Sequence, residues 1–102
     1  MSKVDTVVKT NLNVNLAEPP MFKIIYLNDN ATPMEFVIET LIDSFSYNEQ
    51  TAVKITQDIH EVGSAVVAVL PYEIAEQKGI EVTVLARNNN YPLQIKLEPE
   101  TV

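Results

Sequence analysis

Hydrophobic and polar positions along this chain follow two periodicities. Short apolar or alternating runs, each bounded by polar residues, predict β-strands. They cover residues 22–27, 65–70 and 93–97. Apolar residues that recur three and four positions apart predict amphipathic helices. These extend from 33 to 45, from 49 to 62 and from 71 to 89. The resulting order, β-α-α-β-α-β, predicts an α+β fold: a small sandwich in which a three-stranded antiparallel sheet carries three helices on one face.

The same pattern assigns residues to the core. The run Ala65–Leu70 is apolar throughout, which is typical of a central strand covered on both faces. Gly79 lies inside the third helix, where glycine costs about 1 kcal/mol relative to alanine. The helical residues expected to face the sheet are Met34, Val37, Ile38, Leu41, Ile42, Phe45, Ala52, Ile55, Ile59, Val62, Ile74, Ala75, Val82, Leu85 and Ala86.

Polar residues and glycine predict where the helices begin and end. Thr32 and Glu35 have the spacing of a Thr-x-x-Glu capping box, with Pro33 at the first helical position. Asn48 is expected to cap the second helix, and Gly63 to follow its last residue.

Length and composition predict one folded domain. The 102 residues are 46% hydrophobic and include no cysteine, so neither a disulfide nor a cysteine-ligated metal is available. No apolar run approaches the roughly 20 residues of a membrane span, and the N-terminus lacks the features of a signal peptide. We therefore expect a cytoplasmic protein that makes no contact with a membrane. Residues 1–20 predict a flexible N-terminal arm ahead of a core domain at 21–102.

The acidic charge limits the choice of partners. Seven basic and 14 acidic residues give a net charge of −7. Phosphate contacts require clustered Lys and Arg, so nucleic acid is a poor partner. A cationic ligand group or a basic protein surface is more compatible.

A polar ledge separates the first strand from the first helix. Asn28, Asp29 and Asn30 precede the apolar Met34 and Val37. A polar ledge at the mouth of an apolar pocket suits a ligand with one charged or polar end and one apolar end. The three ledge residues are also common turn formers, so the pattern leaves a purely structural role open.

His60 is the only histidine in the sequence. Thr56, Ile59 and His60 are spaced to share one helical face, although spacing alone favours a surface histidine near a helix C-terminus. A single histidine without a carboxylate cluster predicts no metal site. Two glycines in total exclude a phosphate-cradling loop, and the sequence shows no nucleophile–base pair. We expect neither enzymatic activity nor a cofactor.

Four motifs give the chain a resemblance to a known family. They are Leu27-Asn28-Asp29-Asn30-x-Thr32-Pro33-Met34-Glu35-Phe36-Val37, Ile59-His60-x-x-Gly63-x-Ala65, Glu73-Ile74-Ala75-Glu76-x-Lys78 and Tyr91-Pro92-Leu93-x-x-x-Leu97-Glu98. Over residues 21–98 the chain resembles ClpS, the adaptor of ClpA/ClpC-type AAA+ proteases that recognises N-degrons. The first and last motifs, in this order, are the most specific.

The resemblance implies a binding protein without catalysis of its own. Family members hold a substrate by a first residue that is usually Leu, Phe, Tyr or Trp, with a free α-amino group. By resemblance, Asn28, Asp29 and His60 contact the amino group, and Asn30 lies near the ledge. The implied pocket residues are Thr32, Pro33, Met34, Val37, Thr56, Ile59 and Leu93.

The resemblance also implies a partner. Glu73 and Lys78 match the surface that docks on the N-terminal domain of a ClpA- or ClpC-type ATPase, and we expect a monomer. The alternative is a ClpS-like modulator that docks on the ATPase and changes its substrate choice without binding N-degrons.

Three positions depart from the family pattern. Asn30 replaces a residue that is commonly acidic, and Pro71 replaces the hydroxyl cap usual before the third helix. Thr56 replaces a residue that is commonly Met or another apolar type. A smaller, more polar wall at Thr56 predicts an altered ranking among Leu, Phe, Tyr and Trp, with a relative gain for larger or hydroxylated rings.

Overall fold

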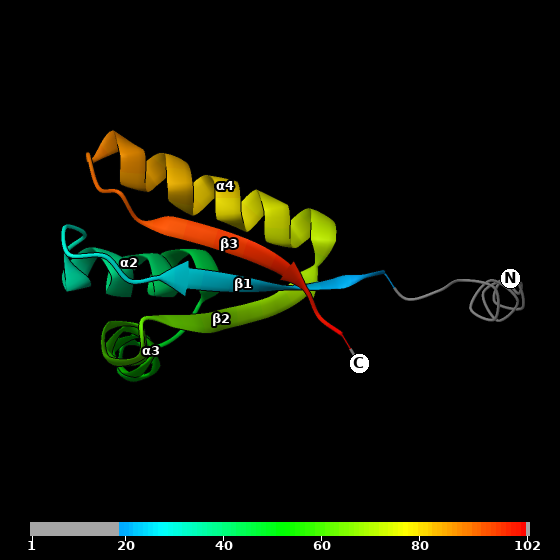
Figure 1. The fold of residues 1–102 in the computed structure, drawn as a ribbon, viewed down its shortest axis with the longest axis horizontal. Coiled ribbons are helices and arrows are strands. Elements are labelled where there is room, and N and C mark those ends of the chain that lie inside the picture. Colours follow the sequence, from blue (N-terminus) through cyan, green and yellow to red (C-terminus); the bar gives the residue numbers. More distant parts are fainter. Residues whose placement is uncertain (1–18, 102) are drawn as a thin grey trace, which may run out of the picture.

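The computed structural model describes residues 19–101 as one sheet packed against three helices (Figure 1). The elements are β1 (Met21–Leu27), α2 (Met34–Phe45), α3 (Glu49–Val62), β2 (Ser64–Pro71), α4 (Tyr72–Asn88) and β3 (Gln94–Pro99). This confirms the predicted α+β class and the order of its elements. The predicted arm lies outside the described residues except for Pro19 and Pro20. The carbonyl oxygen of Pro20 accepts a hydrogen bond from the backbone N–H of Tyr72, at 3.1 Å.

The sheet has the order β2-β1-β3, and β1 pairs antiparallel with both neighbours. The prediction that Ala65–Leu70 forms the central strand is therefore wrong, because β2 lies at an edge. Its apolar character reflects contact with α3 and α4. The central strand is β1, in which Ile24 and Tyr26 are fully buried.

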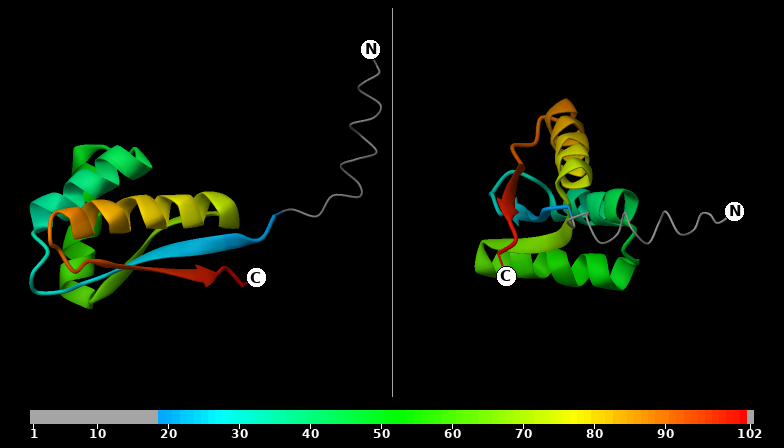
Figure 2. Two further views of the ribbon diagram at one scale, coloured as in Figure 1. Left: turned by 90° about the horizontal axis from the view of Figure 1, so that it is seen from above. Right: turned by 90° about the vertical axis from the view of Figure 1, so that its right-hand side faces the viewer.

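The helices form the second layer of the fold. In Figure 2, α2 and α4 cover the sheet, and α3 packs beside α2 at the β2 edge. The buried stripe of α4 consists of the small or medium residues Ala75, Gly79, Val82 and Ala86, which bring the helix close to the strands. This stripe, at spacings of three and four, fixes which side of α4 faces the core.

Four residues predicted to face the core are instead exposed. Met34 is 40% exposed at the first position of α2. Val62 is 78% exposed, because it is the last residue of α3 and extends past the sheet. Ile74 and Leu85 are 44% and 43% exposed, since they flank the buried stripe of α4. In the opposite sense, the pattern missed Phe36 and Thr40, which are buried in α2. Thr40 is buried because its hydroxyl hydrogen-bonds the Tyr26 hydroxyl at 2.7 Å.

The helix ends confirm two of the predicted caps and contradict a third. Asn48 caps α3 by accepting a hydrogen bond from the N–H of Thr51 at 2.8 Å, and Gly63 follows with a left-handed φ of 108°. The capping box at Thr32 is wrong. Helix α2 begins one residue later than predicted, with Pro33 in the cap position and no side-chain cap. Thr32 instead hydrogen-bonds Asp29, so its hydroxyl is used in the loop before the helix.

The two glycines are expected to respond oppositely to alanine. A Cβ at Gly79 would lie 3.7 Å from the Ile95 side chain and 3.8 Å from that of Leu97, both ordinary contacts. Gly79→Ala should therefore stabilise the fold by about 1 kcal/mol and raise Tm by about 4–8 °C. Gly63→Ala should destabilise it by about 1 kcal/mol, because alanine is strained at positive φ. Thermal unfolding followed by circular dichroism measures both, and a lower Tm for Gly79→Ala would contradict the packing of α4 on β3.

Candidate functional site

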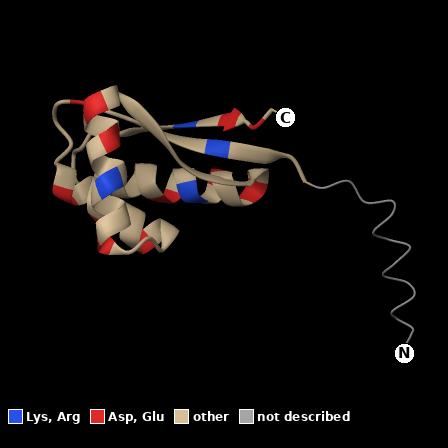
Figure 3. Ribbon diagram, turned by 90° about the horizontal axis from the view of Figure 1, so that it is seen from below, with Lys and Arg blue, Asp and Glu red and all other residues tan. Residues whose placement is uncertain are grey.

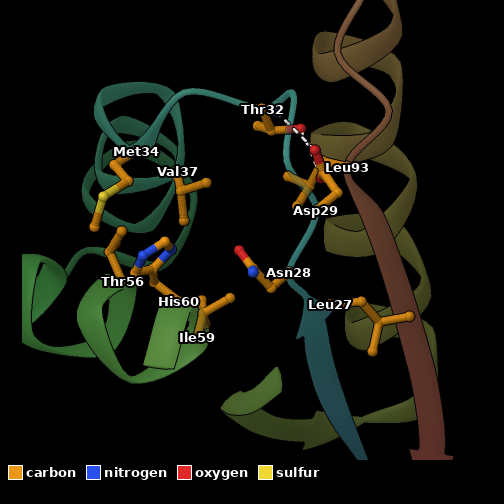
Figure 4. A pocket seen from close by; sticks show the side chains of 10 residues that line it. All are labelled: Leu27, Asn28, Asp29, Thr32, Met34, Val37, Thr56, Ile59, His60 and Leu93. Carbon is orange, nitrogen blue, oxygen red and sulfur yellow. Dashed lines mark hydrogen bonds between the residues drawn. The ribbon is translucent and has the colours of Figure 1, made fainter. Parts of the chain in front are cut away.

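A pocket opens where β1 ends, between the start of α2 and the last turns of α3 (Figure 4). It contains about 270 Å³ of empty space, its mouth included. Its lining combines polar and apolar side chains: Leu27, Asn28, Asp29, Thr32, Met34, Val37, Thr56, Ile59, His60 and Leu93. Leu27 also lines the pocket, although its sequence pattern predicts only the last residue of a strand. Its position directly before the ledge is the signal in the sequence that points to the pocket.

One backbone hydrogen bond brings two sequence-distant parts of the pocket together. The N–H of Asn28 donates to the carbonyl of Gly63 at 2.9 Å, which ties the end of β1 to the turn after α3. His60, one turn before Gly63, is thereby placed across the pocket from Asn28, and Figure 4 shows the two side chains facing each other. The left-handed conformation of Gly63 allows the tight reversal that this approach requires.

The Asp29 carboxylate organises the loop from Asn28 to Pro33. Its Oδ1 accepts from the N–H groups of Ala31 at 2.8 Å and Thr32 at 2.7 Å. Its Oδ2 accepts from the Thr32 hydroxyl at 2.8 Å. The turn-forming role that the sequence left open is therefore present. Because each carboxylate oxygen can accept two hydrogen bonds, Oδ2 keeps capacity for one more donor.

Asp29 is also a permanent negative charge at neutral pH. Partial desolvation opposes its ionisation, but the hydrogen bonds from Thr32 and Ala31 and the nearby Arg87 charge outweigh it. Together they lower the pKa of Asp29 from its ordinary value of 3.8. The pocket thus has an ionised carboxylate at its rim.

The interior of the pocket is apolar, and the side chain of Met34 lies at its mouth. Val37, Ile59 and Leu93 are buried walls, whereas Met34 is 40% exposed. Methionine is unbranched and adaptable, so it suits the edge of a pocket that admits side chains of different shape. Thr56 is buried, and its hydroxyl donates to the Ala52 carbonyl at 2.8 Å. The Thr56 hydroxyl proton is thus used in a hydrogen bond within α3, and the hydroxyl oxygen can still accept a hydrogen bond from a ligand.

Comparison with known proteins identifies the family. The model of the ClpS family, described as ATP-dependent Clp protease adaptor protein ClpS, matches residues 17–96. The chain belongs to the ClpS family. The ClpS of Acetivibrio thermocellus is 41% identical over 95 residues, covering 93% of this chain and 96% of that protein. The ClpS of Roseobacter denitrificans is 41% identical over 96 residues, covering 94% of this chain and 85% of that protein.

A solved ClpS structure has the same fold. Agrobacterium tumefaciens ClpS2 bound to L-phenylalaninamide aligns with a TM-score of 0.79 and 40% identity. The alignment covers 81% of this chain and all of that chain. The family and the fold implied by the sequence motifs are therefore confirmed, and the chain is an adaptor of the ATP-dependent Clp protease.

Pro33, which was predicted for the edge of the pocket, does not line it. Pro33 instead borders a separate groove with Phe36 and Tyr91. Asn30 is exposed in the loop, near the ledge but outside the lining.

Glu73 and Lys78, predicted for docking, lie on the first two turns of α4. In the sheet, the start of α4 adjoins the beginning of β1, since Met21 pairs with Pro71. The pocket adjoins the other end of β1, beyond Leu27. The two predicted binding surfaces are therefore at opposite ends of the molecule.

Charge, metal and membrane features of the described residues bear on other ligand classes. In the ribbon of Figure 3, the described positions of Lys and Arg are separated from one another along the chain and do not form a continuous basic cluster. Among residues 19–101, no three His, Asp or Glu side chains gather to form a metal site. None of the described helices is long and apolar enough to cross a membrane.

Thr32→Val should raise the pKa of Asp29 toward 3.8, because it removes the hydroxyl donor to Oδ2. A folded-state pKa below the unfolded value stabilises the protein above the unfolded pKa, and this contribution is lost as pH falls through the folded pKa. The stability cost of Thr32→Val should therefore be present at neutral pH and diminish in acid below the Asp29 pKa. Titration of the Asp29 carboxyl by NMR measures the shift. Thr51→Val, at the start of α3, is the control, and an unchanged Asp29 pKa in Thr32→Val would contradict the assignment.

Proposed function

We propose that this ClpS-family protein is an N-degron adaptor. It binds substrates by a bulky hydrophobic N-terminal residue with a free α-amino group and delivers them to a ClpA- or ClpC-type ATPase–protease. The observation that carries the proposal is the placement of ionised Asp29, with Asn28 and His60, at the rim of a buried apolar pocket.

The polar rim matches the chemistry of an α-ammonium group. An ammonium has three hydrogen-bond donors and one positive charge. Oδ2 of Asp29, the carbonyl oxygen of Asn28 and a ring nitrogen of His60 that carries no proton can serve as three acceptors. Hydrogen bonds to a charged group are about twice as strong as neutral ones. Acetylation would remove the charge and two donors, so an N-acetylated chain end should not bind.

The apolar interior matches the first side chain of the substrate. Burying a Leu or Phe side chain contributes about 1.5–3 kcal/mol. Val37, Ile59 and Leu93 supply this surface, and Met34 at the mouth restricts bulk close to the substrate backbone. We infer that β-branched Val and Ile are excluded, because their extra methyl lies at Cβ, where the substrate backbone passes Met34.

The related structure supports this choice of ligand. The Agrobacterium tumefaciens protein is bound to L-phenylalaninamide, a small molecule with a free α-amino group and an aromatic side chain. Those are the two features that the rim and the interior of this pocket are built to accept.

Delivery requires a second surface. We infer that Glu73 and Lys78 contact the N-terminal domain of the ATPase, in the cytoplasm and as a monomer. Both lie in the first two turns of α4, away from the helix end that adjoins the pocket, so substrate and ATPase can be bound at the same time.

Fluorescence anisotropy with labelled peptides tests the pocket. Peptides that begin with Leu, Phe, Tyr or Trp should bind with Kd of about 1 μM. Peptides that begin with Ile, and an N-acetylated Phe peptide, should not bind. Asp29→Ala and His60→Ala should abolish binding, because each removes an acceptor for the ammonium. Lys54→Ala, on the exposed side of α3, is the control and should leave Kd unchanged.

The alternative function has a different outcome in the same assay. A modulator that only docks on the ATPase would bind none of the peptides yet would still bind the purified ATPase domain. Under the adaptor proposal, the double variant Glu73→Ala/Lys78→Ala should retain peptide affinity and lose ATPase binding, which isothermal titration measures.

Thr56→Met should change the ranking of ligands. The larger side chain narrows the pocket. Affinity for Tyr and Trp peptides should therefore fall relative to that for Leu peptides by about threefold to tenfold, or about 0.7–1.4 kcal/mol. Thr56→Val keeps the size but removes the hydroxyl, and it should reduce only the preference for Tyr. A ranking identical in all three proteins would show that position 56 does not shape specificity.

A further inference from the structure

Arg87 is the only arginine in the sequence, and it lies in the last turn of α4. Its Nη1 donates two hydrogen bonds of 2.8 Å, one to the carbonyl of Tyr91 and one to the carbonyl of Leu93. These two carbonyls flank Pro92. A single side chain thus holds the segment that connects α4 to β3.

We propose that Arg87 is a positioning residue of the peptide pocket, holding the Leu93 wall in place and coupling it to the Asp29 rim. The inference rests on the function proposed above and adds a residue that does not line the pocket. It identifies the α4–β3 connection as a determinant of which N-terminal side chains are accepted.

Strand pairing does not hold Leu93. Pairing of β3 with β1 begins at Gln94, opposite Leu27, so Leu93 lies one residue outside the ladder. Pro92, directly before it, has no N–H to donate. The Arg87 hydrogen bonds therefore replace the strand pairing that this wall lacks.

The connection between α4 and β3 turns sharply at the helix end. Asn90 has a left-handed φ of 62°, and the N–H of Tyr91 donates to the carbonyl of Ala86 at 2.9 Å. The Tyr91 ring packs edge-on against Phe36 of α2, with centroids 4.9 Å apart. Tyr91 is thus anchored on both sides, and Arg87 extends this anchoring to Leu93. A cation in the last helical turn is also favoured by the helix dipole.

Arg87 also acts through its charge. Arg87 is among the groups that keep Asp29 ionised, so it acts on the polar rim as well as on the apolar wall. In Figure 4, Asp29 and Leu93 lie on one side of the pocket, with His60 and Thr56 across from them. The guanidinium of Arg87 therefore affects both the polar rim at Asp29 and the apolar wall at Leu93.

The test compares two replacements of Arg87 in the full-length protein. Arg87→Met keeps an apolar stem but removes donors and charge. Arg87→Lys keeps the charge and a donor nitrogen. In the peptide assay, Arg87→Met should weaken binding of a Phe peptide by about fivefold to tenfold, and Arg87→Lys should recover part of that loss. Lys54→Met, which also removes one exposed positive charge, should have no effect.

A double-mutant cycle separates positioning from general destabilisation. If Arg87 acts through Leu93, Arg87→Met should have much less effect on Kd in a Leu93→Ala background than in the wild type. The ratio of Kd for Phe and Leu peptides should also change in Arg87→Met, a readout that a uniform loss of folded protein would not move. Circular dichroism confirms the folded fraction of each variant.

Each outcome decides between the two proposals. Wild-type protein that binds no free N-terminus would overturn the proposed function and this inference with it. Wild-type binding combined with equal affinity and selectivity in Arg87→Met would overturn the inference alone. Additive effects of Arg87→Met and Leu93→Ala would also overturn it, because they would show that Arg87 does not act through the pocket wall.

Discussion

The pocket depends on one carboxylate. Asp29 accepts three hydrogen bonds from the loop that follows it, and these bonds turn the chain from β1 into α2. The same bonds lower its pKa, so the group that shapes the loop also supplies the negative charge at the rim. After these bonds, Oδ2 retains one free acceptor position. Under the proposed function, the same side chain therefore shapes the loop and binds the substrate's amino group.

The wall opposite the rim is supported by a buried polar chain. Tyr26 is fully buried in β1 and hydrogen-bonds Thr40, which donates in turn to the carbonyl of Val37. Burial raises the pKa of Tyr26, so its phenol stays protonated and can donate to Thr40. Since Val37 lines the pocket, this chain sets the position of α2 relative to the central strand. A buried polar network of this kind fixes one position of the helix on the sheet. Apolar contacts alone would allow several such positions.

The sequence predicted the elements well because their signals are local. Asn48 and Gly63 mark helix ends through bonds that reach no more than four residues, so both predictions were confirmed. Predictions of burial failed where tertiary contacts determine which residues are buried. Helix α4 buries Gly79 and exposes Ile74 and Leu85, because close approach to the strands selects for small residues over hydrophobic ones.

The pocket was predictable only in part, for a related reason. Its ledge is contiguous in sequence, and the residues on α3 share a helical face, so both could be found by spacing. Thr32 was misassigned because a threonine three residues before a glutamate fits a capping box and an Asp29 partner equally well. The contribution of Arg87 could not be found at all, since a cation near a helix C-terminus already has a sufficient local explanation.

The arrangement of the two ends explains how so small a domain can serve as an adaptor. Helix α4 runs from the proposed docking residues, at Glu73, to Arg87 beside the pocket. At 1.5 Å per residue, Arg87 lies about 21 Å along the helix from Glu73 and about 13.5 Å from Lys78. Both distances exceed the Debye length of about 8 Å at physiological ionic strength, so charges at one site act weakly on the other. Substrate capture and ATPase docking can then be independent, as delivery requires, while the sheet and α4 hold them in a fixed relative orientation.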